Sequence, residues 1–90
     1  MNKCLRITLV VNALSNIHTI MRDRAHTLGV EGTVQCVDQT TIRVIVCGPV
    51  PKVDDFIDVL HNDYYDCIEY IEMEPFIKER DYRGVFRVIE

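Results

Sequence analysis

Two spacings of apolar residues alternate along the chain, and their order constrains the fold more than any other feature. Residues 3–11, 32–37, 41–47, 68–74 and 85–89 have the alternating pattern or the composition of strands. Residues 17–28, and a second segment from about residue 51 to residue 63, have the three- and four-residue spacing of amphipathic helices. The predicted order is therefore β-α-β-β-α-β, followed by a short tail strand.

This order is typical of an α+β fold of the ferredoxin-like, split βαβ type. It predicts an antiparallel four-stranded sheet that carries both helices on one face and leaves the other face partly open. We expect four groups of apolar residues to form the core between the sheet and the helices, two groups from the strands and two from the helices. They are Leu5, Ile7, Leu9 and Val11; Ile42, Val44 and Val46; Ile17, Ile20, Met21, Ala25 and Leu28; and Val53, Phe56, Ile57 and Leu60.

Residues that favour caps and turns separate these segments. Ser15 or Asn16 is the predicted N-cap of the first helix, and Gly29 is its predicted left-handed C′ residue. Residues 38–40 are the predicted hairpin turn, although they lack the glycine that such turns favour. The Gly-Pro-Val-Pro stretch at 48–51 ends the third strand.

The size and the charge restrict the class of protein. Ninety residues suit one domain, predicted as residues 1–90. The net charge is −4, and residues 53–75 contain eight acidic side chains and no Lys or Arg. Such a surface repels a phosphate backbone, so nucleic acid is not an expected partner. A solvated surface is the favoured interpretation of this segment, and a docking surface for a basic partner is the alternative.

The chain shows no apolar run long enough for a membrane span and no secretory signal, so we expect a cytoplasmic protein. Its four cysteines have no metal-binding spacing, and neither a metal nor another cofactor is expected. Cys4 and Cys47 should be neighbours on the open face of the sheet. A disulfide between them would form in an oxidising setting, but two inert thiols are the preferred interpretation.

Four stretches together resemble the acylphosphatase family across nearly the whole chain. They are residues 25–35 (AHTLGVEGTVQ), residues 42–49 (IRVIVCGP), the predicted helix at 53–60 and the ending at 85–88 (VFRV). The L-G-x-x-G spacing at 28–32 agrees with the strand lengths, the Gly-Pro break and the ending, and together they carry the resemblance. The resemblance implies an acylphosphatase-like fold and, for the family, hydrolysis of the carboxyl-phosphate bond of acyl phosphates.

The family motif that carries this reaction is a loop, G-R-V-Q-G-V-x-F-R, between the first strand and the first helix. Its backbone N–H groups and final Arg hold the phosphate, and an Asn in the second strand positions the attacking water. The matching positions here hold Val10 and Leu14 instead of the glycines, His18 instead of the Arg, and Cys36 instead of the Asn. The loop that could retain weak anion binding comprises Leu14, Ser15, Asn16, Ile17 and His18.

These departures predict an acylphosphatase-like module that has lost hydrolysis and serves in binding or regulation. The alternative is a divergent acylphosphatase with His18 and Cys36 at its catalytic positions. The fold should bring these two residues near each other. The preferred interpretation is that His18 is a partly exposed side chain and Cys36 a small apolar one. The alternatives are a reactive thiol and a pair of metal ligands. The candidate partners are a small anion, a protein, or a second copy of the chain. The second copy would bind through the open face or a strand edge.

Overall fold

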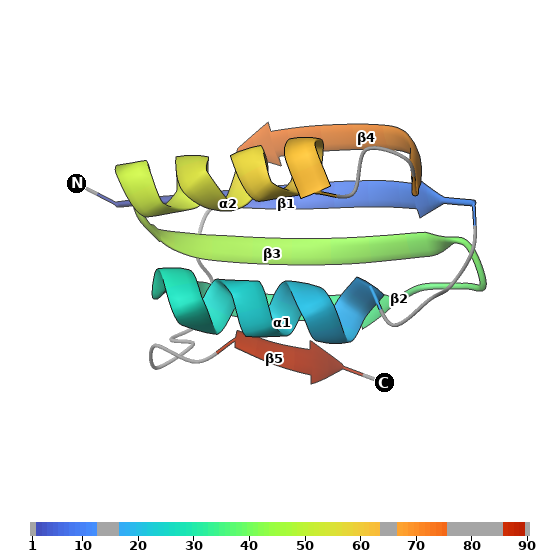
Figure 1. Cartoon of the computed structure of the whole chain (residues 1–90), viewed down its shortest axis with the longest axis horizontal. Coiled ribbons are helices and arrows are strands. Elements are labelled where there is room, and N and C mark those ends of the chain that lie inside the picture. The colour runs from blue at the N-terminus through green and yellow to red at the C-terminus, as the bar shows by residue number, and fades with distance from the viewer. Residues whose placement is uncertain (1, 13–16, 64–66, 76–85, 90) are drawn as a thin grey trace.

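The chain folds into one sheet with two helices, seen in a computed structural model that describes residues 2–12, 17–63, 67–75 and 86–89. The elements follow the predicted order (Figure 1). They are β1 (Asn2–Val11), α1 (Ile17–Leu28), β2 (Glu31–Cys36), β3 (Thr41–Pro49), α2 (Val50–Asp63), β4 (Ile68–Pro75) and β5 (Phe86–Ile89).

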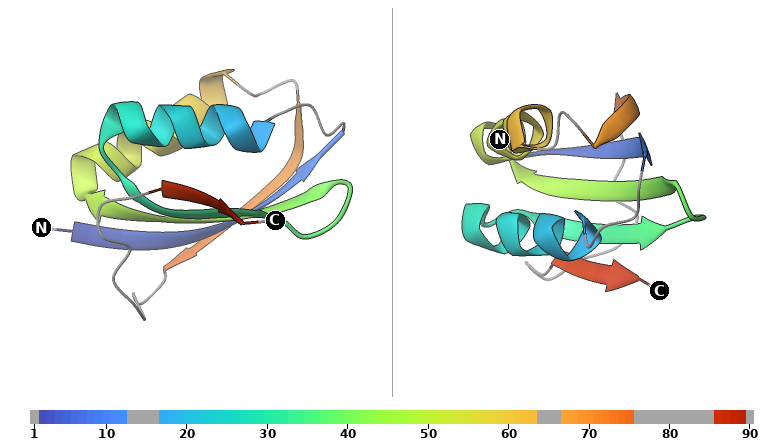
Figure 2. Two further views of the ribbon diagram at one scale, coloured as in Figure 1. Left: turned by 90° about the horizontal axis from the view of Figure 1, so that it is seen from below. Right: turned by 45° about the vertical axis from the view of Figure 1, so that its right-hand side comes forward.

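The sheet has the strand order β4-β1-β3-β2-β5. β1 pairs with both β3 and β4, β2 pairs with β3, and all three of these pairings are antiparallel. This confirms the predicted four-stranded antiparallel sheet. The tail strand β5, whose place was left open by the sequence, adds to the edge of β2 in parallel. Both helices lie on one side of the sheet (Figure 2), which confirms the ferredoxin-like arrangement.

The hydrophobic core lies between the helices and the sheet. Alternate residues of β1, β2 and β3 face it, as period-two alternation requires. Its fully buried members include most of the residues predicted for β1 and β3, namely Ile7, Leu9, Val11, Ile42, Val44 and Val46. Leu5, also predicted, is partly buried and packs against the core. The helices contribute Met21 and Ala25 from α1, and Val53, Phe56 and Leu60 from α2. Phe86 of β5 completes the core and packs at 5.9 Å from the Phe56 ring.

Among the predicted core residues whose burial the structure describes, one lies outside this core. Ile20 is 42% exposed, although its spacing placed it on the apolar face of α1. Successive helical residues are rotated by about 100°, so Ile20 lies at the flank of the stripe that Met21 and Ala25 turn toward the sheet. The helix therefore buries a narrower stripe than its apolar residues suggest.

The connection from α1 to β2 is closed by backbone hydrogen bonds around Gly29. The Val30 N–H donates to the Ala25 carbonyl at 3.1 Å, and the Gly29 N–H donates to the His26 carbonyl at 3.2 Å. With Gly29 at a φ of 78°, this is a Schellman motif, which confirms the predicted C′ glycine. The motif turns the chain directly into β2.

The first residues of β2 approach β3 so closely that only glycine fits at position 32. Gly32 has a φ of 145°, and a Cβ added there would lie 1.8 Å from the carbonyl oxygen of Ile45. The second glycine of the L-G-x-x-G spacing thus permits backbone-to-backbone contact between β2 and β3.

The prediction of two inert thiols at Cys4 and Cys47 was wrong, because the structure joins them in a disulfide. The two residues are direct partners in the β1–β3 register, with their Cα atoms 4.1 Å apart. The register confirms the predicted proximity. Reduced thiols were predicted because a cytoplasmic protein was expected, and cytoplasmic thiols usually stay reduced. Cys36 and Cys67 are free and partly buried.

Candidate functional site

The elements that carry the predicted site positions share one end of the molecule. β1 ends, α1 begins and β2 ends at the same end of the sheet (Figure 1). The order of the elements produces this arrangement, because α1 runs back along the sheet and β2 returns beside it. The topology therefore places the beginning of α1 and the end of β2 where the family resemblance predicts the site.

Cys36 is the predicted site residue that the structure places most fully. It is the last residue of β2, and its register partner on β3 is Ile42. Its side chain is partly buried and packs against the hydrophobic core, as a small apolar residue would. The thiol is a weak hydrogen-bonding group, so it offers little to orient a water molecule.

The predicted anion loop is only partly within the described residues. Leu14, Ser15 and Asn16, including both candidate N-caps, lie outside them. Ile17 and His18 are the first two residues of α1, so their backbone stands at the helix N-terminus. The proximity of the His18 and Cys36 side chains therefore stays a prediction, as does anion binding at this loop.

The turn that follows Cys36 is held by a single carboxylate. Asp38 Oδ1 accepts hydrogen bonds from the Thr40 and Thr41 N–H groups, each at 2.8 Å, and from the Thr40 hydroxyl at 3.3 Å. These bonds confirm the predicted turn at residues 38–40 and explain how it forms without glycine. The backbone hydrogen bond from Thr40, with the bonds around it, lowers the pKa of the Asp38 carboxyl.

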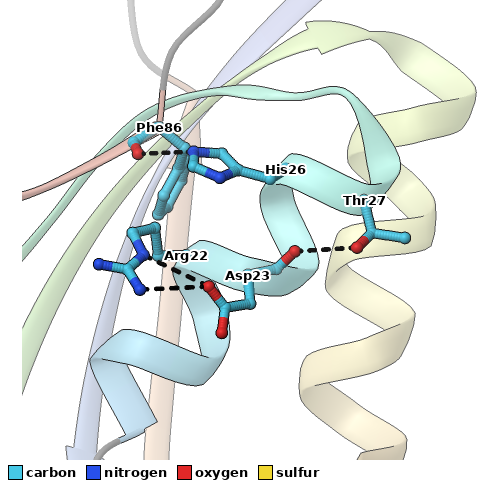
Figure 3. A network of polar contacts seen from close by, with 5 residues as sticks. All are labelled: Arg22, Asp23, His26, Thr27 and Phe86. Atoms are coloured by element: carbon cyan, nitrogen blue, oxygen red, sulfur yellow. Dashed lines mark hydrogen bonds and ion pairs between the residues drawn. The ribbon is translucent and has the colours of Figure 1, made fainter.

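In the C-terminal half of α1, His26 contacts β5, and neighbouring polar side chains bond within the helix (Figure 3). The His26 Nε2 lies 3.1 Å from the Phe86 carbonyl oxygen, which only accepts, so this ring nitrogen carries the proton. Thr27 donates from its hydroxyl to the Asp23 carbonyl at 3.0 Å, and Asp23 also forms an ion pair with Arg22. The contact between His26 and Phe86 was not predicted, because it joins residues 60 positions apart.

A concave region, which the sequence did not indicate, lies between α2 and β4. It is a groove of about 180 Å³ lined by Leu60, His61, Ile68, Glu69, Tyr70 and Ile71. Tyr70 donates from its hydroxyl to Glu72 Oε2 at 2.9 Å. This hydrogen bond to the neighbouring carboxylate raises the pKa of the Tyr70 phenol.

Two classes of feature are missing from the described part of the chain. No group of three or more His, Cys, Asp and Glu side chains gathers there with the geometry of a metal site. None of the described helices is long and apolar enough to cross a membrane.

Comparisons with known proteins identify the class of fold. An acylphosphatase from Coxiella burnetii superposes with a TM-score of 0.83 at 18% sequence identity, over 98% of this chain and 93% of that one. The acylphosphatase from Bacillus subtilis gives the same TM-score at 14% identity over the full length of both chains. A bacterial light-regulated adenylyl cyclase matches with a TM-score of 0.70 and 20% identity, over 99% of this chain and 28% of that protein.

No known family model matches the sequence, and no curated protein matches it either. At these identities the superpositions show the fold alone. The chain is thus an acylphosphatase-like domain in its fold. The fold occurs both in acylphosphatases and in a part of a light-regulated adenylyl cyclase.

Proposed function

We propose that this chain is an acylphosphatase-like module that has lost acyl-phosphate hydrolysis and acts in binding or regulation. The observation that carries the proposal is Cys36. The resemblance assigns its position to the Asn that orients the attacking water. Here the side chain is a thiol that packs against the core. Loss of a group that positions a nucleophile costs about 100–1000-fold in rate.

The second support comes from the position of the phosphate-binding Arg, which is His18 in this chain. A guanidinium forms two charge-assisted hydrogen bonds to a phosphate, each worth about 1.5–3 kcal/mol. A neutral imidazole carries no charge and only one N–H donor. The two changes affect different parts of the reaction, phosphate binding and water positioning.

The wider occurrence of the fold supports a role without hydrolysis. The light-regulated adenylyl cyclase contains a segment of this fold that makes up 28% of its chain. A split βαβ domain therefore also serves as one part of a larger regulated protein. Fold alone does not fix the reaction, so the site residues decide between the two roles.

The deciding experiment is an acyl-phosphate hydrolysis assay on the purified chain, with benzoyl phosphate as the substrate. We expect turnover no faster than in the same buffer without protein. Enzyme-level turnover that disappears in a His18→Ala variant would contradict the proposal and establish the divergent acylphosphatase instead.

A matched pair of double variants locates the cause of the loss. His18→Arg with Cys36→Asn restores the two family residues, and His61→Arg with Cys67→Asn makes the same exchanges at an exposed histidine and the other free cysteine. Activity only in the first variant would assign the loss to positions 18 and 36. Inactivity in both would assign it to the missing loop glycines at positions 10 and 14.

A further inference from the structure

Within the described part of the chain, one edge of the sheet is unpaired and suits strand addition. β4 is the first strand in the sheet order, and among the described residues only β1 pairs with it. It is 8 residues long and lies at the margin of the sheet (Figure 1). Along its outer side, alternate residues present N–H and C=O groups that pair with an added strand.

The surface along β4 is apolar at several points. Tyr70 is 54% exposed and Met73 is 39% exposed, both large side chains on the same strand. The groove of about 180 Å³ lies beside the first half of the strand, between it and the end of α2. Extended peptides gain affinity from backbone pairing and specificity from alternating side-chain sites of this kind.

The charge along this edge has one sign. Glu69 and Glu72 are exposed, whereas Glu74 forms an ion pair with Arg6 of the neighbouring strand. No Lys or Arg occurs in residues 53–75 to offset the exposed carboxylates. A second copy of β4 would bring like charges together, so the charge disfavours pairing between two copies and favours a basic partner.

We propose that the β4 edge binds an extended, basic segment of a partner protein by strand addition. The inference deepens the proposed function, because it names the partner class of a binding module. It does not depend on the positions of His18 and Cys36, since β4 is separated from β2 by two strands.

The register specifies which side chains the partner carries. Tyr70, Glu72 and Glu74 are the register partners of Val10, Thr8 and Arg6, on the sheet face away from the helices. Ile71 and Met73 are opposite Leu9 and Ile7, on the helix face. An added strand continues this alternation. Its Lys or Arg side chains therefore lie beside the glutamates, and its apolar side chains lie beside Met73 and the groove.

The probe is a fluorescent peptide of about ten residues that alternates lysine and valine. It is titrated into the whole chain and followed by fluorescence anisotropy. We expect saturable binding and protection of the β4 amides from hydrogen exchange. A Glu72→Lys variant should bind about five- to tenfold more weakly, because an attraction becomes a repulsion. The matched variant Asp23→Lys, on α1, should bind with unchanged affinity.

Two further peptides separate strand addition from simple charge attraction. A lysine–valine peptide methylated at alternate backbone nitrogens keeps its charge but loses its pairing donors, and a glutamate–valine peptide keeps its donors but reverses its charge. Equal binding of the methylated peptide would overturn strand addition, and equal binding of the acidic peptide would overturn the charge argument. If sedimentation shows a stable dimer that cannot bind the peptide, the β4 edge binds a second copy of the chain and not a basic partner, which would overturn the proposal.

The outcome is independent of the hydrolysis assay. Peptide binding together with acyl-phosphate turnover would refute the proposed function and keep the inference about β4. Absence of both would refute the inference and keep the proposed loss of hydrolysis.

Discussion

At the scale of single residues, Gly32 is the least able of the described glycines to accept a side chain. Its φ of 145° is strained for an L-residue, and a Cβ there would lie 1.8 Å from the Ile45 carbonyl oxygen. We expect Gly32→Ala to lower the free energy of unfolding by about 3 kcal/mol or more, because β2 and β3 must separate. Urea denaturation followed by circular dichroism measures this loss.

Gly48 supplies the control for that substitution. A Cβ there would meet the nearest Val30 side-chain atom at 3.4 Å, an ordinary van der Waals distance, and the residue has no positive φ. We expect Gly48→Ala to change the free energy of unfolding by no more than about 1 kcal/mol. Equal losses in the two variants would contradict the role of close approach at Gly32.

Asp38 makes part of the stability dependent on pH. Its hydrogen bonds to Thr40 and Thr41 favour the charged form, so its folded-state pKa lies below the ordinary value of 3.8. The stability that these hydrogen bonds contribute is therefore fully present at a pH above 3.8, and it is lost as the pH falls through the folded-state pKa. We expect Asp38→Asn to reduce the fall in stability below about pH 4. An NMR titration of Asp38 to an undepressed pKa would refute this.

At the scale of elements, His26 ties α1 to β5. Its Nε2 donates to the Phe86 carbonyl at 3.1 Å, at the parallel edge of the sheet. We expect His26→Ala to lower the free energy of unfolding by about 1 kcal/mol and to speed amide exchange in β5 more than in β1. Thr27→Ala, at the next residue, removes a bond within α1 and serves as the control. Equal amide exchange in β5 of both variants would contradict the role of the His26–Phe86 hydrogen bond in holding β5.

The elements were predictable where the local pattern and the tertiary structure agree. Strict alternation identified the buried faces of β1 and β3, which pair with each other without interruption. β4 departs from alternation, because its register against β1 shifts between Val10 and Val11. Ile68 and Ile71 therefore both pack against the core, although a regular strand would turn them to opposite faces. A bulge of this kind depends on the partner strand, and the single sequence does not reveal it.

The arrangement of the elements around the candidate site was predictable, whereas the site and its chemistry stay predictions. The order of the elements alone brings the start of α1 and the end of β2 together, and the family resemblance selected Cys36 there. The groove beside β4 was not predictable, because its lining comes from α2 and from a strand with a bulge. Likewise, the parallel pairing of β5 depends on backbone contacts with β2, which no local pattern in residues 86–89 encodes.

At the scale of the whole molecule, the disulfide between Cys4 and Cys47 connects positions 43 residues apart in the sequence. A cross-link of this span restricts the unfolded chain, which typically stabilises a protein by about 2–4 kcal/mol. We expect reduction with dithiothreitol to lower the free energy of unfolding by this amount, measured by urea denaturation. A variant with Cys4→Ala and Cys47→Ala should be insensitive to the reductant, whereas one with Cys36→Ala and Cys67→Ala should respond as the original chain does. An original chain whose stability is the same with and without reductant would show that the cross-link does not stabilise the fold.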